Sequence, residues 1–593
     1  MTEGELVPSG LPPGRSLVDQ GRRLARAVDT GWATYARNRG VRNERYYKER
    51  TIASGEITYY INLGLKSWPE TRAALREVLA AAERLDVRVD RVSLTTDRRM
   101  GLAPELRREA IEETGIMFWT PEDWQGAAED LDIMPILNDH SVGSPAGVDN
   151  ALAAVCAGFG YVGNLSQMNY GYACAVSDVE QMMATVVAMG VIAEKKDDGV
   201  VLDSYTDDGF CASFHDAATS IGWCLLHRYI ADDLVGCAYA PSYGSTFADP
   251  LLKQAFGLAL DAINVSRVPP SVVHGDTNSL QPHYSLDRNA AIVTTDIYFT
   301  IANQLAHPTG TSVHPTPLTE PHRIPTVEDI VQSLEIGREA ERRARQSYPL
   351  IDWRPVYALR DRLVAAGREV FSRMMDGLAV MGVDTSDALQ LLIATRRLGA
   401  QQIERLFGAG EADTAHPRGR VPVVPTDTLR RASESLETVL RSINQMAEAP
   451  DLRGVKVVAA SGDIHEYGLY TLVAVLEELG CDVHNLGTSV DNGRIAAAVA
   501  ESAADVVALS TYNGMALSLG RDLIDRLVER GLHPTVYIGG RLTEDLPNQK
   551  SADVTAPLAA AGAVPCASIT AMVESLSELD RSRLNLRSRR HRP

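Results

Sequence analysis

The stretch that decides the fold of the C-terminal part is Val455-Lys-Val-Val-Ala-Ala-Ser-Gly-Asp463-Ile-His465-Glu-Tyr-Gly468. Its apolar first half predicts a buried strand, and the residues that follow Gly468 predict a helix. The hexapeptide Asp463–Gly468 therefore lies on a strand-to-helix turn. That turn carries an imidazole two residues after a carboxylate, and a glycine where a bulky ligand can approach the backbone.

Two further segments follow this turn at defined spacings. Forty-one residues separate Gly468 from Ser510, and 26 separate Tyr512 from the pair Gly539-Gly540. Around them, strand-like runs (Val455–Ala460, Val483–Leu486, Val506–Ser510, Thr535–Ile538) alternate with helical ones (about Tyr467–Leu479, Asp491–Ser502, Ser518–Arg530, Ser568–Leu576). This alternation predicts a flavodoxin-like (Rossmann-like), doubly wound sheet that binds its ligand at the carboxyl ends of the strands. A dinucleotide site is disfavoured because no G-x-G-x-x-G follows the first strand.

These residues resemble the fingerprint D-x-H-x-x-G, S-x-L, G-G of the cobalamin-binding domain of base-off/His-on corrinoid enzymes. Tyr512 stands where that family usually has leucine. The resemblance implies that His465 is the axial ligand of cobalt, and Asp463 can accept the other ring N–H of His465. It also implies that the nucleotide tail of the cofactor is bound by Gly468, Ser510, Tyr512, Gly539 and Gly540.

Composition restricts the remaining function classes. The chain has 593 residues, 45% hydrophobic and 23% charged, which is ordinary for two or more globular domains. Its net charge of −19 argues against a nucleic-acid partner. Seven cysteines without a C-x-x-C pair favour a reducing cytoplasm, and no apolar run is long enough to predict a membrane span.

The first half of the chain predicts a second α/β architecture. Between about Ile57 and Pro325, candidate strands alternate with helices: Val89–Thr95, Ile133–Leu137, Val200–Ser204, Val235–Tyr239, Ser271–His274 and Ala291–Asp296. This length and pattern suit a (β/α)8 TIM-like barrel. The expected organisation is a helical extension (1–50), a catalytic barrel (51–325), a second helical extension (326–408), a linker (409–427), a cobalamin-binding domain (428–580) and a basic disordered tail (581–593).

Polar residues collect just after these candidate strands. In a barrel such loops form the active-site face, so a small-molecule substrate site is expected there. The candidate catalytic and substrate-contacting residues are Arg98, Arg99, His140, Asn164, Gln167, Tyr170, His274 and Asp276.

The whole chain resembles glutamate mutase with its two subunits joined in one polypeptide. The resemblance rests on Ala157-Gly-Phe-Gly-Tyr-Val-Gly-Asn164-Leu-Ser-Gln167, Thr95-Thr-Asp97-Arg98-Arg99, Leu406-Phe-Gly408 and Ser510-Thr-Tyr-Asn-Gly514. It implies an adenosylcobalamin-dependent isomerase, a radical mutase acting on an amino acid or a related small carboxylic acid, and a homodimer. The family binds a dicarboxylate with several arginines. Here only Arg98 or Arg99 matches, and Thr120–Asn150 contains no arginine but offers Asp139 and His140.

Two alternatives remain open. Corrinoid methyl transfer would use a helical cap before the cobalamin domain, and residues 326–447 could supply one, although no zinc or folate motif supports it. A non-catalytic cobalamin carrier or sensor is the other, and the polar cluster after the strands of the first half argues against it.

Overall fold

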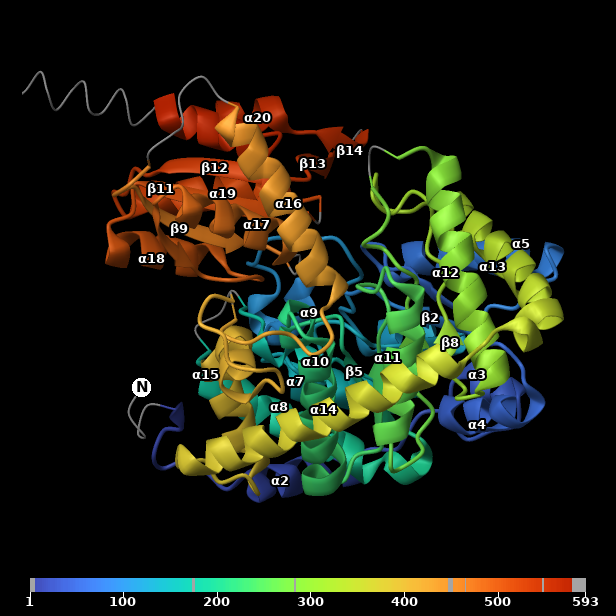
Figure 1. Ribbon diagram of the computed structural model, residues 1–593. Coiled ribbons are helices and arrows are strands. Elements are labelled where there is room, and N and C mark those ends of the chain that lie inside the picture. Colours follow the sequence, from blue (N-terminus) through green and yellow to red (C-terminus); the bar gives the residue numbers. More distant parts are fainter. Residues whose placement is uncertain are drawn as a thin grey trace, which may run out of the picture. The chain divides into compact units, whose positions relative to one another are not determined.

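The computed structural model describes residues 6–172, 176–281, 284–416, 418–445, 452–463, 466–512, 514–546 and 549–578. The chain divides into two compact units, Met1–Asn169 with Cys174–Asp427, and Tyr170–Ala173 with Thr428–Pro593. Both units are mixed α/β structures with parallel sheets (Figure 1). Each is described by itself below.

Helices and short strands alternate along the first unit. The strands are β1 (Tyr60–Asn62), β2 (Arg91–Ser93), β3 (Met134–Ile136), β4 (Tyr161–Val162), β5 (Val201–Tyr205), β6 (Tyr239–Ser242), β7 (Val272–Val273) and β8 (Ser312–Val313). The helices are α2 (Gly14–Arg26), α3 (Thr34–Asn38), α4 (Glu44–Ser54), α5 (Trp68–Arg84), α6 (Pro121–Glu129), α7 (Gly147–Ala157), α8 (Asp178–Glu194), α9 (Phe210–Ser213), α10 (Ala217–Arg228), α11 (Pro250–Ile263), α12 (Leu286–Ala306), α13 (Val327–Ser347), α14 (Arg354–Val380) and α15 (Ala388–Phe407).

All strand pairs of the first unit are parallel. The strands form sheets of order β1-β2-β3, β4-β5-β6 and β7-β8. Single parallel bridges join neighbouring sheets, at Leu137 with Val162, at Tyr243 with Val273 and at Tyr59 with Val313. Strand β3 is therefore linked to β4, β6 to β7, and β8 back to β1.

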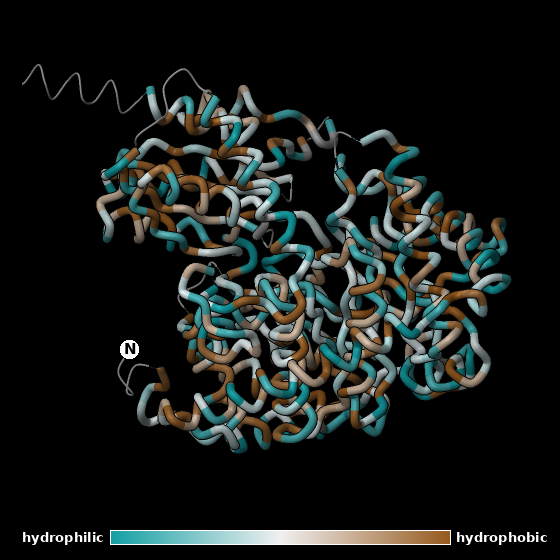
Figure 2. The backbone as a smooth tube through the Cα atoms, viewed as in Figure 1, coloured by the Kyte–Doolittle hydropathy of each residue, from teal (hydrophilic) through white to brown (hydrophobic). Residues whose placement is uncertain are grey.

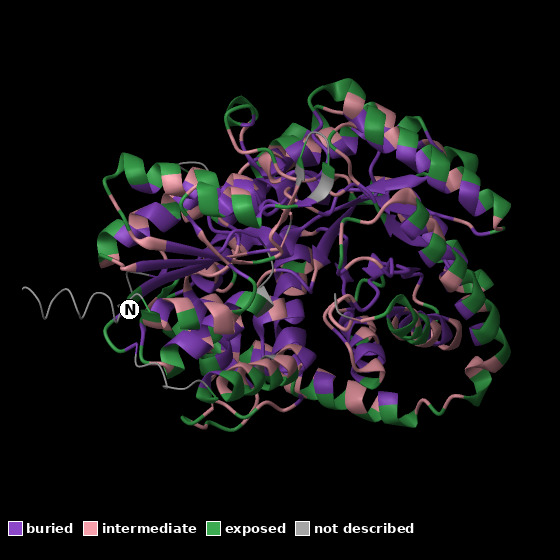
Figure 3. Cartoon of the chain, turned by 90° about the horizontal axis from the view of Figure 1, so that it is seen from above, coloured by how far each residue is buried: buried purple, intermediate pink, exposed green. Residues whose placement is uncertain are grey.

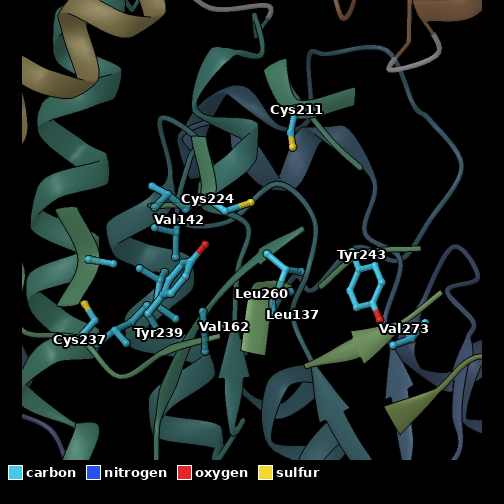
Figure 4. Close-up of a cluster of buried hydrophobic side chains, with 14 of the residues drawn as sticks. Leu137, Val142, Val162, Cys211, Cys224, Cys237, Tyr239, Tyr243, Leu260 and Val273 are labelled. Atoms are coloured by element: carbon cyan, nitrogen blue, oxygen red, sulfur yellow. The ribbon is translucent and has the colours of Figure 1, made fainter. Parts of the chain in front are cut away.

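The core of the first unit lies on both faces of these strands. One apolar cluster contains Tyr60, Ile136, Tyr161, Val201, Ala240 and Val272, which come from six different strands. A larger cluster packs the helices onto the strands, and Figure 4 shows part of it, including Leu137, Val162, Tyr239 and Leu260. The strands are buried, while the helices alternate between buried and exposed faces (Figure 3) and between hydrophobic and hydrophilic residues (Figure 2).

The predicted strand Ala291–Asp296 is wrong, because these residues lie inside helix α12. Val293, Ile297 and Ile301 are buried at a spacing of four residues, which is the period of a helix that covers a core. The side chain of Ser285 accepts a hydrogen bond from the N–H of Arg288 and caps the first turn. The predicted strand Val235–Tyr239 is also displaced, since β6 begins only at Tyr239.

A buried ion pair crosses the beginning of the strands. Arg91 of β2 pairs with Glu44 of α4, and both side chains are almost completely buried. Lys48, one turn further along α4, donates to the carbonyl oxygens of Pro270 and Ser271 at 2.6 Å. These contacts hold α4 against the strand starts.

The Glu44→Ala substitution is therefore expected to lower the free energy of unfolding by about 3–5 kcal/mol, because Arg91 would stay buried without its carboxylate. Urea unfolding of the full chain measures this. The matched control is Glu49→Ala on the same helix, whose exposed pair with Arg45 is worth about 1 kcal/mol or less. Equal effects of the two substitutions would contradict the expectation.

The chain after α15 remains attached to the first unit as far as Asp427. The carboxylate of Asp216 accepts the N–H groups of Val423 and Val424 at 2.8 and 2.9 Å, and Val424 O accepts Ala217 N–H at 2.8 Å. The Asp427 carboxylate accepts two backbone N–H groups at the start of α11. Segment 409–427 therefore lies along the first unit through specific hydrogen bonds.

The second unit contains a five-stranded parallel sheet of order β10-β9-β11-β12-β15. Its strands are β9 (Lys456–Ser461), β10 (Asp482–Asn485), β11 (Val506–Thr511), β12 (Thr535–Gly540) and β15 (Val564–Cys566), with an antiparallel hairpin of β13 (Thr543–Leu546) and β14 (Gln549–Asp553). The helices are α16 (Asp427–Asn444), α17 (Glu466–Glu478), α18 (Asn492–Ser502), α19 (Ala516–Glu529) and α20 (Thr555–Ala560), and residues 569–578 are also helical. The strand order reverses between β9 and β11, which is where doubly wound sheets bind ligands.

Candidate functional site

The two predicted arginines of the first unit both have acidic neighbours. The Arg99 guanidinium donates to both carboxylate oxygens of Asp97, at 2.7–3.0 Å, and Asp97 is fully buried. Asp97 also accepts the N–H of Glu113 at 2.9 Å, and the Glu113 carboxylate lies 3.9 Å from Arg98. The structure thus places both arginines after β2, with carboxylates already beside them.

Asn164 and Gln167 are brought together by a carboxylate that sequence reasoning did not select. Asp208 accepts from Asn164 Nδ2 at 2.7 Å and from Gln167 Nε2 at 3.1 Å. Gln167 also donates to Asp139 at 3.0 Å and accepts the N–H of His140 at 2.8 Å. One connected set of polar groups therefore joins the loops after β3, β4 and β5.

The protonation of this set follows from burial. Burial raises the pKa of Asp139 to about 6, opposed by its hydrogen bond from Gln167. Burial, with the positive charge of Arg98, lowers the pKa of His140 to about 3. His140 is therefore neutral at physiological pH and can donate or accept one hydrogen bond at each ring nitrogen.

His274 and Asp276 lie after β7 and are tied to a buried lysine. Lys253 Nζ donates to the carbonyl oxygen of His274 at 2.7 Å and to the Asp296 carboxylate at 2.7 and 2.9 Å. Asp296 also accepts the N–H of Asp276, at 3.0 Å. Burial, together with the charge of Asp296, raises the pKa of Asp276 to about 6.

Asp276 therefore lowers stability as pH rises. Its ordinary pKa is 3.8, so between about pH 4 and 6 the folded chain holds this proton more tightly than the unfolded chain. Ionisation of Asp276 therefore lowers the free energy of unfolding by about 3 kcal/mol over that range. We expect the free energy of unfolding of Asp276→Asn, relative to wild type, to rise by up to that amount between pH 4 and 7. Urea unfolding at several pH values tests this, and parallel curves would contradict it.

Tyr170 is buried and groups with the second compact unit. Tyr205 and Asp208 belong to the polar cluster expected after the candidate strands but were not chosen as site residues. Tyr60, which begins β1, and His314, which follows β8, were not selected from the sequence. For His314 the only sequence signal is a histidine after a two-residue strand, which is too short to recognise by its periodicity.

Asp463 is the central residue of the second site. It lies two residues after β9, is 4% exposed, and its carboxylate accepts the N–H of Tyr512 and, at 3.3 Å, the Thr511 hydroxyl. Its other oxygen lies 3.4 Å from the hydroxyl of Ser461. Ile464 and His465 lie outside the described residues. The end of β11 thus fixes the orientation of the Asp463 carboxylate.

Ser461, Ser510 and Gly539 lie side by side at the carboxyl edge, in register across β9, β11 and β12. Gly468 is exposed, and a Cβ there would lie 3.3 Å from the Ser510 hydroxyl. Gly540 has φ +101°, and a Cβ on it would lie 2.0 Å from Thr511 O, so a side chain is excluded there. The edge is therefore lined by small residues.

The Tyr512 ring contacts a cation that sequence reasoning missed. The guanidinium carbon of Arg541 lies 4.2 Å from the ring centroid, and the backbone N–H of Arg541 donates to Thr511 O at 2.8 Å. The aromatic side chain at the departure from the fingerprint therefore forms a cation–π contact next to the sheet edge.

Comparison with known proteins identifies the domain that carries this second site. A family model described as the B12 binding domain matches residues 454–560. The second unit contains a B12-binding domain. The glutamate mutase sigma subunit of Halobacterium salinarum (strain ATCC 700922 / JCM 11081 / NRC-1) is 36% identical over 80 residues, 14% of this chain and 54% of that protein. The chain thus spans about half the length of the curated relative it matches. Together the two findings support a cobalamin-binding protein.

Two solved structures are also similar to parts of the chain. One is a cobalamin-binding protein from Desulfitobacterium hafniense DCB-2, 20% identical, with a TM-score of 0.19, covering 35% of this chain and 89% of that one. The other is the methanol:cobalamin methyltransferase complex MtaBC from Methanosarcina barkeri, 15% identical, with a TM-score of 0.18, covering 53% and 92%.

The edge of the B12-binding domain fits a corrinoid with a long nucleotide tail. A buried carboxylate, held by Thr511 and Tyr512, suits the second partner of a metal-binding imidazole. Small residues leave the backbone accessible beside the Ser510 hydroxyl. Among the described residues, no group of three or more His, Cys, Asp or Glu side chains could hold a separate metal ion. Within the same ranges no helix is both long and apolar enough to span a membrane.

Proposed function

We propose that this chain is an adenosylcobalamin-dependent isomerase that rearranges the carbon skeleton of an amino acid or a related small carboxylic acid. The observation that carries the proposal is the joining, in one chain, of a B12-binding domain to an α/β unit with a polar network after its parallel strands. The identity to a glutamate mutase sigma subunit supports the mutase class.

A (β/α)8 barrel in the first unit is part of this proposal. The three bridges that link β3 to β4, β6 to β7 and β8 to β1 support a closed ring of eight parallel strands. Such a barrel would direct its polar loops to one mouth and exclude water from the substrate.

The residues of the second unit have defined roles in this proposal. His465 would bind cobalt, Asp463 would orient its ring, and Gly468, Ser510, Tyr512, Gly539 and Gly540 would hold the nucleotide tail. When bound, adenosylcobalamin would supply the radical chemistry.

In this proposal the substrate would be contacted by residues of the first unit, namely Arg98, Arg99, His140, Asn164, Gln167, His274 and Asp276. Tyr170, which groups with the second unit, stays a predicted contact. Asn164 and Gln167 are oriented for this by Asp208. His140, being neutral, would add hydrogen bonds without charge. The domain limits expected from the sequence remain proposals. The homodimer is also a proposal, and light scattering of the purified chain tests it.

Electron paramagnetic resonance tests the proposed activity. Protein loaded with adenosylcobalamin and mixed anaerobically with a panel of amino and 2-oxo acids should show cob(II)alamin and an organic radical with at least one of them. The His465→Ala variant should lose the signal. The control His484→Ala, an exposed histidine of β10, should keep it. Silence of the wild type across the panel would contradict the proposal.

Methyl transfer is the second candidate, and its expected helical cap can be compared with the structure. Helices α13, α14 and α15 precede the B12-binding domain, but all three belong to the first unit. Helix α14, for example, packs closely against α10 of the first unit, because Gly222 and Gly367 lie where the two helices meet. Only α16 remains beside the B12-binding domain in sequence. Turnover with methylcobalamin but not with adenosylcobalamin would favour methyl transfer.

A further inference from the structure

Four aromatic rings meet around the residues that follow β7 and β8 in the first unit. The rings of His274, after β7, and His314, after β8, have centroids 5.4 Å apart. Tyr60 of β1 lies edge-on to both, at 5.3 and 5.2 Å. Tyr205, the last residue of β5, lies 4.4 Å from His274. The two imidazoles are thereby fixed in position by rings from two other strands.

Each imidazole carries one deeply buried ring nitrogen. Across the ranges the structure describes, neither Nε2 of His274 nor Nδ1 of His314 has a hydrogen-bond partner, and each residue is only 6% exposed. An unsatisfied buried polar atom costs about 1–3 kcal/mol, so such atoms are rare unless a ligand or water completes them. Two of them on touching rings indicate a binding position.

Both rings are neutral. Burial lowers the pKa of His314 to about 3, with a contribution from the charge of Lys253. Burial also lowers the pKa of His274 well below its usual value, and the positive charges of Lys253 and Arg91 act in the same direction. A neutral imidazole has one N–H and one lone pair, which complement an alcohol, an amide or a carbonyl.

The cations near this ring cluster already have anionic partners. Lys253 Nζ lies 2.7 Å from the Asp296 carboxylate, and Arg91 pairs with Glu44. Neither is arranged like the bidentate arginine that grips a ligand carboxylate. Lys253 and Arg91 are therefore already neutralised, so the ring cluster favours a ligand group that forms hydrogen bonds and carries no second negative charge.

We propose that His274 and His314 form a subsite for a neutral hydrogen-bonding group (alcohol, amide or carbonyl) of the small molecule bound by the first unit. The inference rests on the proposed function, which supplies two sources for such a group, the substrate and the nucleoside of the cofactor. If the group belongs to the substrate, that substrate has one carboxylate and a neutral polar end, unlike glutamate.

Matched substitutions separate the hydrogen bond from the packing of the ring. His274→Leu and His314→Leu remove the nitrogens. His274→Gln keeps a polar group near the position of Nε2, and His314→Asn keeps one near Nδ1. His322→Gln, at an exposed histidine, is the control. Cobalamin binding followed by absorbance, together with thermal unfolding, shows whether each variant is folded.

Calorimetric titration of the full chain with L-glutamine, L-homoserine, L-glutamate and 5′-deoxyadenosine tests the subsite. We expect at least one neutral-ended probe to bind the wild type, with glutamate weaker than glutamine or homoserine. Each leucine variant should lose about 10-fold or more in affinity, and the Gln and Asn variants should stay within about 3-fold. A histidine-dependent response to 5′-deoxyadenosine alone would assign the subsite to the nucleoside.

Preference for glutamate, absence of any response, or leucine variants that bind like the wild type would overturn the subsite. If the leucine variants do not fold, ¹⁵N spectra of the wild-type histidines decide the question, because a bound probe must shift the ring nitrogens of both. A radical signal that the histidine variants leave unchanged would refute the subsite alone. Histidine-dependent binding without any radical would refute only the proposed mutase activity.

Discussion

The Asp463→Ala variant is expected to bind cobalamin about 10- to 100-fold more weakly than the wild type, because outer partners of metal ligands contribute this much to affinity. In the structure the Asp463 carboxylate is buried and receives hydrogen bonds from Thr511 and Tyr512. Its removal would leave these donors unpaired and release the proposed cobalt ligand. Absorbance titration measures the affinity and reports whether the histidine-ligated, base-off form appears.

Asp482→Ala is the control, since Asp482 is an exposed residue of β10 in the same domain. It should bind like the wild type. The conservative variant Asp463→Asn should recover part of the affinity, because its amide oxygen can still accept from Tyr512. Unchanged affinity in Asp463→Ala would show that this carboxylate only stabilises the turn.

The Asp208→Ala variant is expected to reduce turnover about 100-fold while leaving cobalamin affinity unchanged. Asp208 holds the amide groups of Asn164 and Gln167, and Gln167 in turn holds the backbone of His140. Loss of this carboxylate lets all three side chains move, and displacements of about 1 Å can cost two orders of magnitude in rate. Radical formation or substrate turnover measures the effect.

The control for the Asp208→Ala variant is a substitution of a surface carboxylate. Asp233 pairs with Arg228 in an exposed ion pair, so Asp233→Ala should change neither turnover nor cobalamin binding. Loss of cobalamin binding in Asp208→Ala would contradict the assignment of Asp208 to the first unit's own site.

The second unit was largely predictable because its strands are long enough to show periodicity. The expected strands Val455–Ala460, Val506–Ser510 and Thr535–Ile538 correspond to β9, β11 and β12 within about two residues. The short edge strand β15 was not predicted, since three residues leave no pattern.

The first unit was harder to predict because its strands have two to five residues. Strands β1, β4 and β8 were missed, and the run 291–296, with its β-branched Ile, Val and Thr residues, was assigned to a strand although it belongs to α12. Local β-branched residues favour a strand, and only the four-residue spacing of Val293, Ile297 and Ile301 indicates the helix.

Residues of the candidate sites were predictable where they match a known fingerprint. Asp463, Ser510 and Gly540 were found in this way. Thr511 and Asp208 were not, because their importance lies in hydrogen bonds to residues 48 and 44 positions away in sequence. Such partners become visible only when the fold brings the loops together.

The hydrogen bonds between Asp216 and segment 423–424 determine where the chain can be divided for separate expression of its two units. A fragment that ends at residue 408 would take Val423 and Val424 away from the Asp216 carboxylate, and Asp427 away from the start of α11. The fragment would expose the buried Asp216 carboxylate and leave the backbone N–H groups of Ala248 and Asp249 without their acceptor. A cut after Asp427 keeps these contacts within the N-terminal product, so separate expression of the two halves should place its junction there.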